Sequence, residues 1–331
     1  MPARAIALLS GGLDSMLAIR LLQEQGIEVE AVNFQTIFTC CRDDAARAAR
    51  ELGVRLTVLG QEDDYIELIR RPRYGYGKGA NPCIDCRIYM FQRAGALMEQ
   101  LDAQMVVSGE VVGQRPNSQK RRHLAIIAHE AGLEDRLLRP LSAKLLPPTL
   151  PEREGVVDRQ RLGGYHGRGR KGLIKLARRF GFADIPSPST GCSLTEKSFA
   201  GRVHDLIQLD PGSNRWDFEL LNTGRHLRLD GQTKAIVGRN ETENETLTRM
   251  YFAAESRAAA LLTPHNFKGP SVMVIGDWDE QRARLGGGLV LRYAKRFDPQ
   301  DALIRIDRRG EQTIQQMLPA EVDRVAELST L

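Results

Sequence analysis

The chain has 331 residues, 42% of them hydrophobic, with a formal net charge of +5 and a pI near 9.0. This length exceeds the usual size of one hydrophobic core, so we expect two or three domains. No apolar run approaches the ~18–20 residues of a membrane span and no secretory-type leader precedes the first predicted strand, so we expect a cytoplasmic protein without a membrane partner.

The most informative segment is a predicted strand, Ala5–Leu9, followed by the turn Ser-Gly-Gly-Leu-Asp-Ser at residues Ser10–Ser15. An apparent helix then runs from Asp14 to Gln25. A strand that feeds a glycine turn at a helix N-terminus makes an anion site, because unpaired backbone N–H groups converge there on the positive end of the helix dipole. The spacing differs from the longer Walker loop.

The residue types of this turn suit a phosphate group. Two glycines let the backbone approach closely and two serines add hydroxyl donors: Gly11, Gly12, Ser10 and Ser15. Asp14 places a carboxylate beside the phosphate site, as expected if it holds Mg2+ there. The simpler alternative is a strand-to-helix turn that happens to contain two glycines.

The Ser10–Ser15 turn resembles the pyrophosphate-binding loop of the PP-loop ATP pyrophosphatases. The resemblance implies that ATP is cleaved between its α- and β-phosphates. It further implies that an oxygen of the substrate is adenylated and that a nucleophile then displaces AMP.

Strand and helix patterns alternate through the first 140 residues. The candidate strands are Ala5–Leu9, Val29–Phe34, Arg55–Leu59, Met105–Ser108 and Leu137–Leu138. This alternation predicts an α/β fold with a doubly wound, Rossmann-like parallel sheet and right-handed crossovers. Loops at the carboxyl ends of the strands would gather Ser10–Ser15, Thr36–Cys41 and Ser108–Gln114 on one edge.

The five cysteines are Cys40, Cys41, Cys83, Cys86 and Cys192. In a cytosolic chain, metal or redox chemistry is favoured over a disulfide framework. Cys83 and Cys86 form a Cys-x-x-Cys at the start of an apparent helix, where the helix dipole would lower the thiol pKa. Cys192 lies in a small-residue loop, and we interpret Cys40 and Cys41 as part of a loop before a helix.

Three cysteines divided into a Cys-x-x-Cys and one distant thiol are too few for a four-thiolate zinc site. They suit a [4Fe–4S] cluster with Cys83, Cys86 and Cys192 as ligands and one iron open to an exogenous ligand. Persulfide chemistry is an alternative, with Cys192 as sulfur carrier and Cys83 or Cys86 as its resolving partner. Zinc, a simple redox pair or packed thiols also remain open.

Residues 159–179 contain a basic cluster without any acidic residue. Its members are Arg159, Arg161, Arg168, Arg170, Lys171, Lys175, Arg178 and Arg179. A cluster of one sign fits contact with a nucleic-acid phosphate backbone. A solvated basic helix face is the alternative.

Beyond residue 210 the pattern changes to a β-rich α+β module. The segments Arg215–Leu229, Thr233–Val237, Val272–Ile275 and Gly288–Lys295 are predicted as β structure, with a helix over Glu245–Leu262. The module resembles the RNA-binding domain of ribosome-quality-control proteins. Its alternative role is dimerisation or packing, so a homodimer is possible.

Three segments together resemble the tRNA thiouridine synthases of the PP-loop group: Ser10–Ser15, Asn81–Cys86 and Thr190–Cys192. Ser108–Gln114 is similar to the Thr-Gly-Glu-x-x-Gly-Gln loop of 4-thiouridine synthetases. The resemblance implies Asp14, Cys83, Cys86 and Cys192 as catalytic residues. It implies that Ser108 and Gly109 face the nucleotide, with Glu110 and Gln114 as candidates to position base or ribose.

We therefore expect an ATP-dependent sulfurtransferase that adenylates a base oxygen in RNA, with tRNA uridine as target, and replaces it with sulfur. Sulfide or a persulfide carrier would donate the sulfur. The expected domains are a PP-loop domain over 1–145, a basic helical domain over 146–208 and the C-terminal module over 209–331. The alternatives are a PP-loop ligase, amidase or sulfur-transfer enzyme for a small molecule, and a non-catalytic RNA-binding protein.

Overall fold

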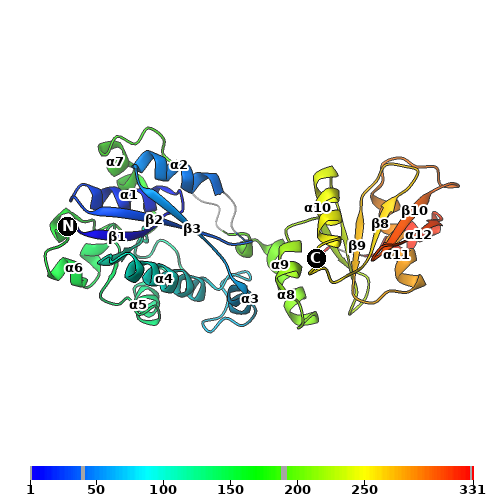
Figure 1. Cartoon of the computed structure of the whole chain (residues 1–331), viewed down its shortest axis with the longest axis horizontal. Helices are drawn as coiled ribbons and strands as arrows, with labels where there is room; N and C mark the ends of the chain where they lie inside the picture. Colours follow the sequence, from blue (N-terminus) through cyan, green and yellow to red (C-terminus); the bar gives the residue numbers. More distant parts are fainter. Residues whose placement is uncertain (1, 39–41, 188–191, 329) are drawn as a thin grey trace. The chain divides into compact units, whose positions relative to one another are not determined.

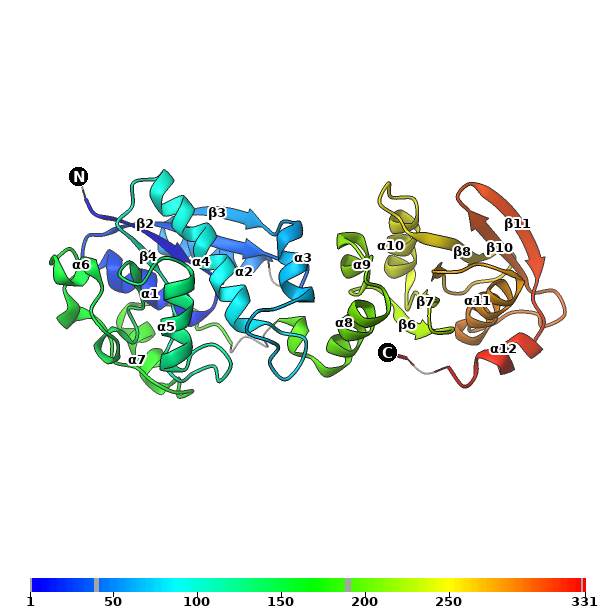
Figure 2. The same cartoon turned by 90° about the horizontal axis from the view of Figure 1, so that it is seen from below.

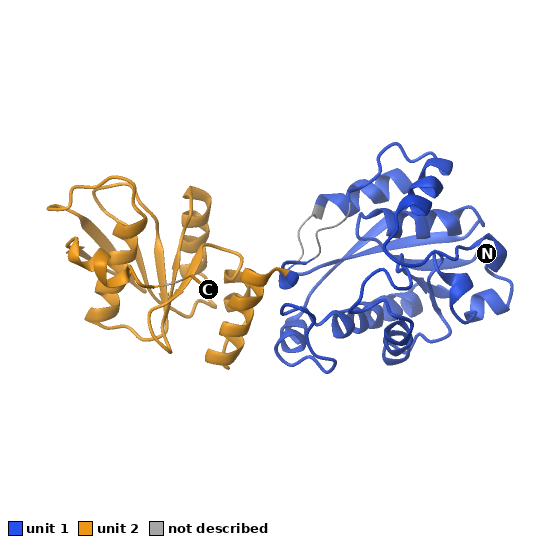
Figure 3. Ribbon diagram, turned by 180° about the vertical axis from the view of Figure 1, so that it is seen from behind, with its two compact units in different colours: residues 1–195 blue, residues 196–331 orange. Residues whose placement is uncertain are grey.

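The computed structural model describes residues 2–38, 42–187, 192–328 and 330–331, and the chain divides into two compact units (Figure 3). Unit 1 is Met1–Thr195 and unit 2 is Glu196–Leu331. The segment 146–208, expected to be a helical domain, is thus shared between the two units. In the part of the chain that is described, no helix combines the length and apolarity needed to cross a membrane.

Unit 1 is built on a five-stranded sheet with the order β3-β2-β1-β4-β5. Its strands are β1 (Arg4–Leu8), β2 (Glu28–Gln35), β3 (Arg55–Gly60), β4 (Met105–Val107) and β5 (Leu137–Leu138). Every neighbouring pair is parallel, which confirms the predicted sheet. The strand order reverses between β1 and β4, so the loops that follow these two strands flank the position where α/β sheets bind ligands.

Helices cover both faces of this sheet, as Figure 1 shows. The helices are α1 (Leu13–Gln23), α2 (Arg42–Leu52), α3 (Asp63–Arg70), α4 (Cys83–Gln100), α5 (Arg121–Glu130), α6 (Leu150–Arg153) and α7 (Lys171–Arg179), with short 3-10 turns η1 (Ala143–Leu145), η2 (Arg159–Arg161) and η3 (Ser193–Thr195). Successive residues of β1 point to opposite faces. Ala5 and Ala7 therefore pack in the core formed with α1, α2 and α7, whereas Ile6 packs with α4 and α5.

Unit 2 contains a six-stranded antiparallel sheet with the order β11-β10-β8-β9-β7-β6. Its elements are α8 (Lys197–Leu209), α9 (Arg215–Leu220), β6 (Arg225–Arg228), β7 (Lys234–Val237), α10 (Glu241–Tyr251), β8 (Ala258–Pro264), β9 (Val272–Ile275), α11 (Glu280–Tyr293), β10 (Leu303–Arg308), β11 (Glu311–Gln316) and α12 (Ala320–Val325). One face of the sheet packs against α11, and the other packs against α9 and α10 (Figure 2). The predicted β-rich α+β module is confirmed.

The predicted β segment Gly288–Lys295 is wrong, because residues 288–293 belong to α11. Glycines lower helix propensity, and three of them stand in a row in this helix. A Cβ at Gly287 would lie 2.5 Å from the sulfur of Met317, and one at Gly288 would lie 2.3 Å from the carbonyl oxygen of Glu321. The glycines therefore serve close packing of the C-terminal segment against α11, and this tertiary contact overrides propensity.

Two further predicted elements are wrong in part. The predicted helix Glu245–Leu262 divides into α10 and β8, because the alanine-rich stretch from Ala258 is a buried central strand. The predicted β segment Arg215–Leu229 begins with α9, whose start is set by a capping box between Asn214 and Asp217. That Asn-x-x-Asp signal is readable in the sequence, whereas the burial of β8 depends on strands far along the chain.

A buried histidine makes the stability of unit 2 depend on pH. His226 on β6 is 2% exposed, and its Nε2 lies 3.0 Å from the carbonyl oxygen of Thr223. Burial, with the nearby charges of Lys234 and Arg202, lowers the pKa of His226 to about 3. In the unfolded chain, the imidazole of this histidine takes up a proton below a pKa of about 6.5. Between about pH 6.5 and pH 3, only the unfolded chain binds that proton, so acid favours unfolding.

We predict that unit 2 loses about 2 kcal/mol of unfolding free energy from this histidine between pH 7 and pH 5. Replacement by glutamine, which keeps an N–H donor, should remove that part of the pH dependence. Denaturant unfolding followed by tryptophan fluorescence measures it, because Trp216 and Trp278 both belong to unit 2. An equal pH dependence in wild type and His226→Gln would contradict the prediction.

Candidate active site

The turn between β1 and α1 has the backbone geometry of an anion site. Gly11 has φ +79°, and a Cβ there would lie 2.6 Å from atoms of Asp44, so only glycine fits. Gly12 is the N-cap of α1, with an extended backbone and no side-chain cap. The N–H groups of the first turn of α1 therefore have no side chain to bind and are available to an anion.

The two serines of this turn hold it together. The hydroxyl of Ser15 donates to the carbonyl oxygen of Gly12 at 2.8 Å and accepts from the backbone N–H of Ser10 at 3.3 Å. The two hydroxyl oxygens lie 3.4 Å apart. The structure thus places Ser10, Gly11, Gly12 and Ser15 in one closed turn at the N-terminus of α1.

The loop after β4 packs directly on this turn. A Cβ at Gly109 would lie 2.5 Å from the backbone nitrogen of Ser15 and 2.6 Å from the carbonyl oxygen of Asp14. Ser108 is buried, and its hydroxyl accepts from the N–H of Glu110 at 3.1 Å. Farther along the loop, Nε2 of Gln114 donates to Oδ2 of Asp14 at 2.8 Å. The two loops singled out in the sequence therefore meet.

Glu110 does not present a free carboxylate, since it is 3% exposed and lies between two arginines. Nε of Arg139 lies 3.0 Å from one of its oxygens and Nε of Arg87 lies 3.6 Å from the other. The interpretation of Glu110 as a base or ribose contact is therefore wrong. Its buried charge instead holds Arg87, which directly follows Cys86 on α4.

The three predicted cysteines Cys83, Cys86 and Cys192 lie within electrostatic reach of one another although Cys192 is far from the other two in sequence. Cys83 begins α4, and the segment after Cys192 binds beside it: the N–H of Ala80 donates to the carbonyl oxygen of Leu194 at 2.9 Å. Burial, with a smaller contribution from the charges of Cys86 and Cys83, raises the pKa of Cys192 to about 12. Cys40, Cys41 and residues 188–191 lie outside the described residues.

The expected lowering of the thiol pKa is wrong for Cys86. Burial raises its pKa and outweighs the hydroxyl of Tyr65, 3.2 Å from the sulfur, and the charge of Arg87. The sulfur of Cys83 accepts a hydrogen bond from Nδ2 of Asn81 at 3.0 Å. Sequence reasoning missed the roles of Tyr65 and Asn81. Asn81 could have been found from its position two residues before Cys83, whereas nothing in the sequence points to Tyr65.

The three thiols are neighbours but not a ligand set. Across the described ranges, no group of three or more His, Cys, Asp or Glu side chains is arranged to hold a metal ion. A [4Fe–4S] cluster on Cys83, Cys86 and Cys192 would therefore need a different arrangement of their sulfur atoms.

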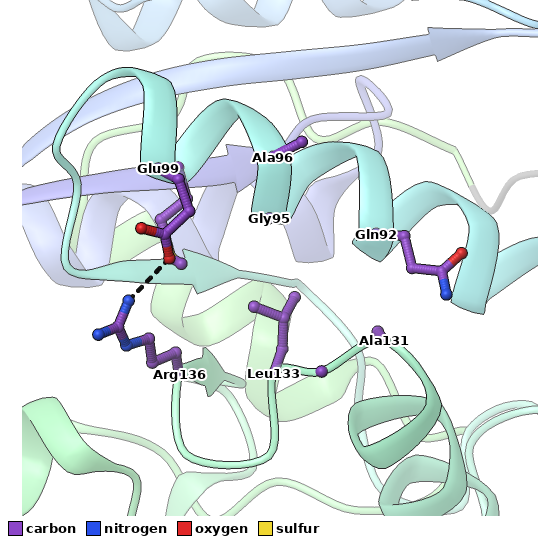
Figure 4. Close-up of a pocket in the computed structure, with 9 residues that line it drawn as sticks. Gln92, Gly95, Ala96, Glu99, Ala131, Leu133 and Arg136 are labelled. Carbon is purple, nitrogen blue, oxygen red and sulfur yellow. Dashed lines mark hydrogen bonds and ion pairs between the residues drawn. The ribbon is translucent and has the colours of Figure 1, made fainter.

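A separate hollow of about 460 Å³ lies between α4 and the turn after α5, as Figure 4 shows. Gly95 and Leu133 line it, and Arg136 pairs with Glu99 at 3.0 Å on its rim. None of the predicted site residues contributes to this hollow. The predicted residues lie instead on the loops after β1 and β4 and at the N-terminus of α4. We take this region as the candidate active site.

Comparisons with known proteins bear out the resemblance inferred from the sequence. Residues 3–132 match the family described as tRNA methyl transferase HUP domain, and residues 224–327 match the NFACT protein RNA binding domain. The chain is 29% identical over 259 residues to the tRNA-specific 2-thiouridylase MnmA of Methylobacterium nodulans, covering 72% of this chain and 61% of that protein. The MnmA of Trichlorobacter lovleyi is 31% identical over 157 residues, 44% of each chain.

The chain thus spans 61% or less of these curated relatives. Among solved structures, it is similar to a 4-thiouridine synthetase in complex with RNA and bound ATP, with 19% identity and a TM-score of 0.41 over 65% of this chain and 53% of that one. The family matches and the curated relatives confirm that the chain resembles the PP-loop tRNA thiolation enzymes and carries a module similar to an RNA-binding domain.

We predict that Gly109→Ala weakens ATP binding at least tenfold and lowers the melting temperature of unit 1. The added methyl group would overlap the backbone of the turn and displace it. Gly60→Ala at the end of β3 is the control, because a Cβ there meets nothing within 4 Å. Calorimetric titration with ATP measures both variants. Equal ATP affinities would show that the close approach of the two loops does not matter for binding.

Proposed function

We propose that the chain is an ATP-dependent RNA sulfurtransferase that thiolates a uridine of tRNA in the cytoplasm. The observation that carries the proposal is the meeting of an anion-binding turn and a group of thiols at one edge of the sheet. Gly109 packs on the turn, and Glu110 beside it pairs with Arg87 next to Cys86. The similarity to tRNA-specific 2-thiouridylases supports tRNA as the substrate.

In the first step, the target oxygen of the base attacks the α-phosphorus of ATP. A P–O bond to the base forms, the bond between the α-phosphorus and the bridging oxygen breaks, and pyrophosphate leaves. The N–H groups at the start of α1 would bind the departing phosphates, and Asp14 would hold Mg2+ beside them. Gln114 orients that carboxylate through its 2.8 Å hydrogen bond. Positioning and charge neutralisation supply most of the acceleration.

In the second step, sulfur replaces the adenylated oxygen. The terminal sulfur of a Cys192 persulfide, loaded by a persulfide carrier, attacks the base carbon; the C–S bond forms, the C–O bond breaks and AMP leaves with the oxygen. The thiolate of Cys83 then attacks the Cys192 sulfur, which releases the thiolated base and leaves a Cys83–Cys192 disulfide. A thiol reductant restores both cysteines. Cys83 suits this role better than Cys86, because burial raises the pKa of Cys86 and its sulfur contacts the hydroxyl of Tyr65.

The cluster route remains the alternative for the sulfur step. A [4Fe–4S] cluster would supply an open iron for an exogenous sulfur ligand. Iron and acid-labile sulfide analysis of the anaerobically purified chain separates the routes, since only a cluster gives about four irons per chain that disappear in Cys83→Ala.

The basic cluster supplies a surface for the RNA beside this site. On α7, Leu173 and Ala177 are buried, and the opposite face exposes Lys171, Lys175, Arg178 and Arg179. Arg159, Arg161 and Arg170 bind protein groups instead, so they serve the fold. The N–H of Gly167 donates to the carbonyl oxygen of Val112 at 2.8 Å, which joins the basic segment to the loop after β4.

We predict that the chain converts ATP to AMP and pyrophosphate and that tRNA stimulates this reaction. Asp14→Asn should lower the rate about 100-fold, because it removes the carboxylate expected to hold Mg2+. Asp63→Asn, an exposed carboxylate on α3, is the control. Chromatography of radiolabelled products checks the cleavage position. ADP as the product, or an unchanged rate in Asp14→Asn, would contradict the proposed step.

We predict that the double variant Lys175→Ala/Arg178→Ala binds tRNA more weakly and lowers the slope of log affinity against log salt by about 1 to 2. With two fewer side chains on the phosphates, fewer counterions are released on binding. The control is Arg47→Ala/Arg50→Ala on α2, which removes the same charge from another exposed helix. Filter binding at several salt concentrations measures both. Equal salt slopes in the two double variants would show that α7 does not contact the RNA.

A further inference from the structure

One arginine in the candidate active site has its backbone held in a turn, whereas its guanidinium has no ion pair or hydrogen bond among the described residues. Arg115 lies in the tight turn Gly113–Gln119, where Gly113 has φ +77°. The N–H of Gly113 donates to the carbonyl oxygen of Gln119 at 2.7 Å. The N–H of Gln119 donates to the carbonyl oxygen of Arg115 at 2.9 Å. The N–H of Arg115 donates to Oε1 of Gln119 at 3.1 Å. Ser118 and Gln119 are buried, so the turn is anchored in the core.

The position of Arg115 joins the two halves of the site. Its neighbour Gln114 binds Asp14 of the anion-binding turn. The surrounding protein and the charge of Arg87 lower the pKa of Arg115, whereas the charges of Cys83, Asp14 and Glu110 raise it. Asp14 of the anion-binding turn and Cys83 of α4 are therefore both within electrostatic reach of the guanidinium of Arg115.

No ion pair neutralises the charge of Arg115 among the described residues. Its side chain is exposed, and in the described part of the chain its guanidinium forms no ion pair or hydrogen bond. The other two arginines here, Arg87 and Arg139, share the buried carboxylate of Glu110. A guanidinium that makes no contact within the fold adds little to its stability, and a planar fork of N–H donors matches the oxygens of a phosphate group.

We propose that Arg115 binds the α-phosphoryl group of the nucleotide, both in its transfer to the RNA base and in the AMP that leaves. This assignment rests on the proposed function, in which the α-phosphoryl group is the one part of the nucleotide that must face both the anion-binding turn and the sulfur-bearing residues. A guanidinium there would neutralise the charge that develops on this group through its fork of N–H donors.

The test compares AMP with adenosine, which lacks the phosphate, as ligands for the full chain. Arg115→Ala should weaken AMP binding tenfold or more and change adenosine binding less than twofold, because only the phosphate loses a charged partner. Arg115→Lys should restore part of the AMP affinity, since it returns the charge but not the fork. The control is Arg55→Ala at the start of β3, on the opposite edge of the sheet, where the side chain is 90% exposed.

Unchanged AMP affinity in Arg115→Ala, or equal losses for AMP and adenosine, would overturn the assignment. Assays of tRNA thiolation keep the two proposals apart. A wild-type chain that binds AMP through Arg115 but thiolates no RNA would refute the proposed function and leave standing only the contact of Arg115 with the phosphate of AMP. A chain that thiolates tRNA and cleaves ATP equally fast with and without Arg115 would refute the assignment alone.

Discussion

The site depends on one steric constraint, the close approach of two loops at the point where the strand order of the parallel sheet reverses. Gly109 presses on the backbone at Asp14 and Ser15, where no side chain would fit. Because this contact joins the loops after β1 and β4, it also fixes the positions of the neighbouring residues of the second loop. Gln114 reaches Asp14, and Glu110 reaches Arg87 on the cysteine helix. The same few residues thereby link the turn after β1 to the N-terminus of α4, where Cys83 and Cys86 lie.

The turn at the start of α1 and the three cysteines differ in their charge and in their protonation. At the turn, the N-terminus of α1 and the guanidinium of Arg115, which has no ion pair among the described residues, both favour anions. Cys83, Cys86 and Cys192 are half-buried, and burial raises the pKa of Cys86 and of Cys192, so these two thiols stay neutral near pH 7. A neutral thiol is a poor nucleophile. This agrees with the proposed mechanism, in which Cys192 reacts as a persulfide and not as a thiol.

The sequence predicted the features that depend on neighbouring residues. The anion-binding turn, all five strands of unit 1 and the grouping of the loops arise from local patterns, and the structure confirms the sheet. The glycines of α11 and the alanine-rich β8 were misread, because contacts with distant residues decide their conformation. The raised pKa of Cys86 and the unpaired state of Arg115 escaped prediction for the same reason, since burial and missing partners are properties of the packed chain.

The most direct test of sulfur transfer is mass spectrometry of nucleosides from tRNA incubated with the chain, ATP, Mg2+ and a persulfide donor. The account predicts a thiouridine in amounts equal to the AMP released, and its loss in Cys192→Ser with the ATP cleavage step retained. Thiouridine formation by Cys192→Ser at the wild-type rate would contradict the role of Cys192. No thiouridine from the wild-type chain, despite ATP cleavage, would contradict the central claim and indicate another nucleophile or substrate.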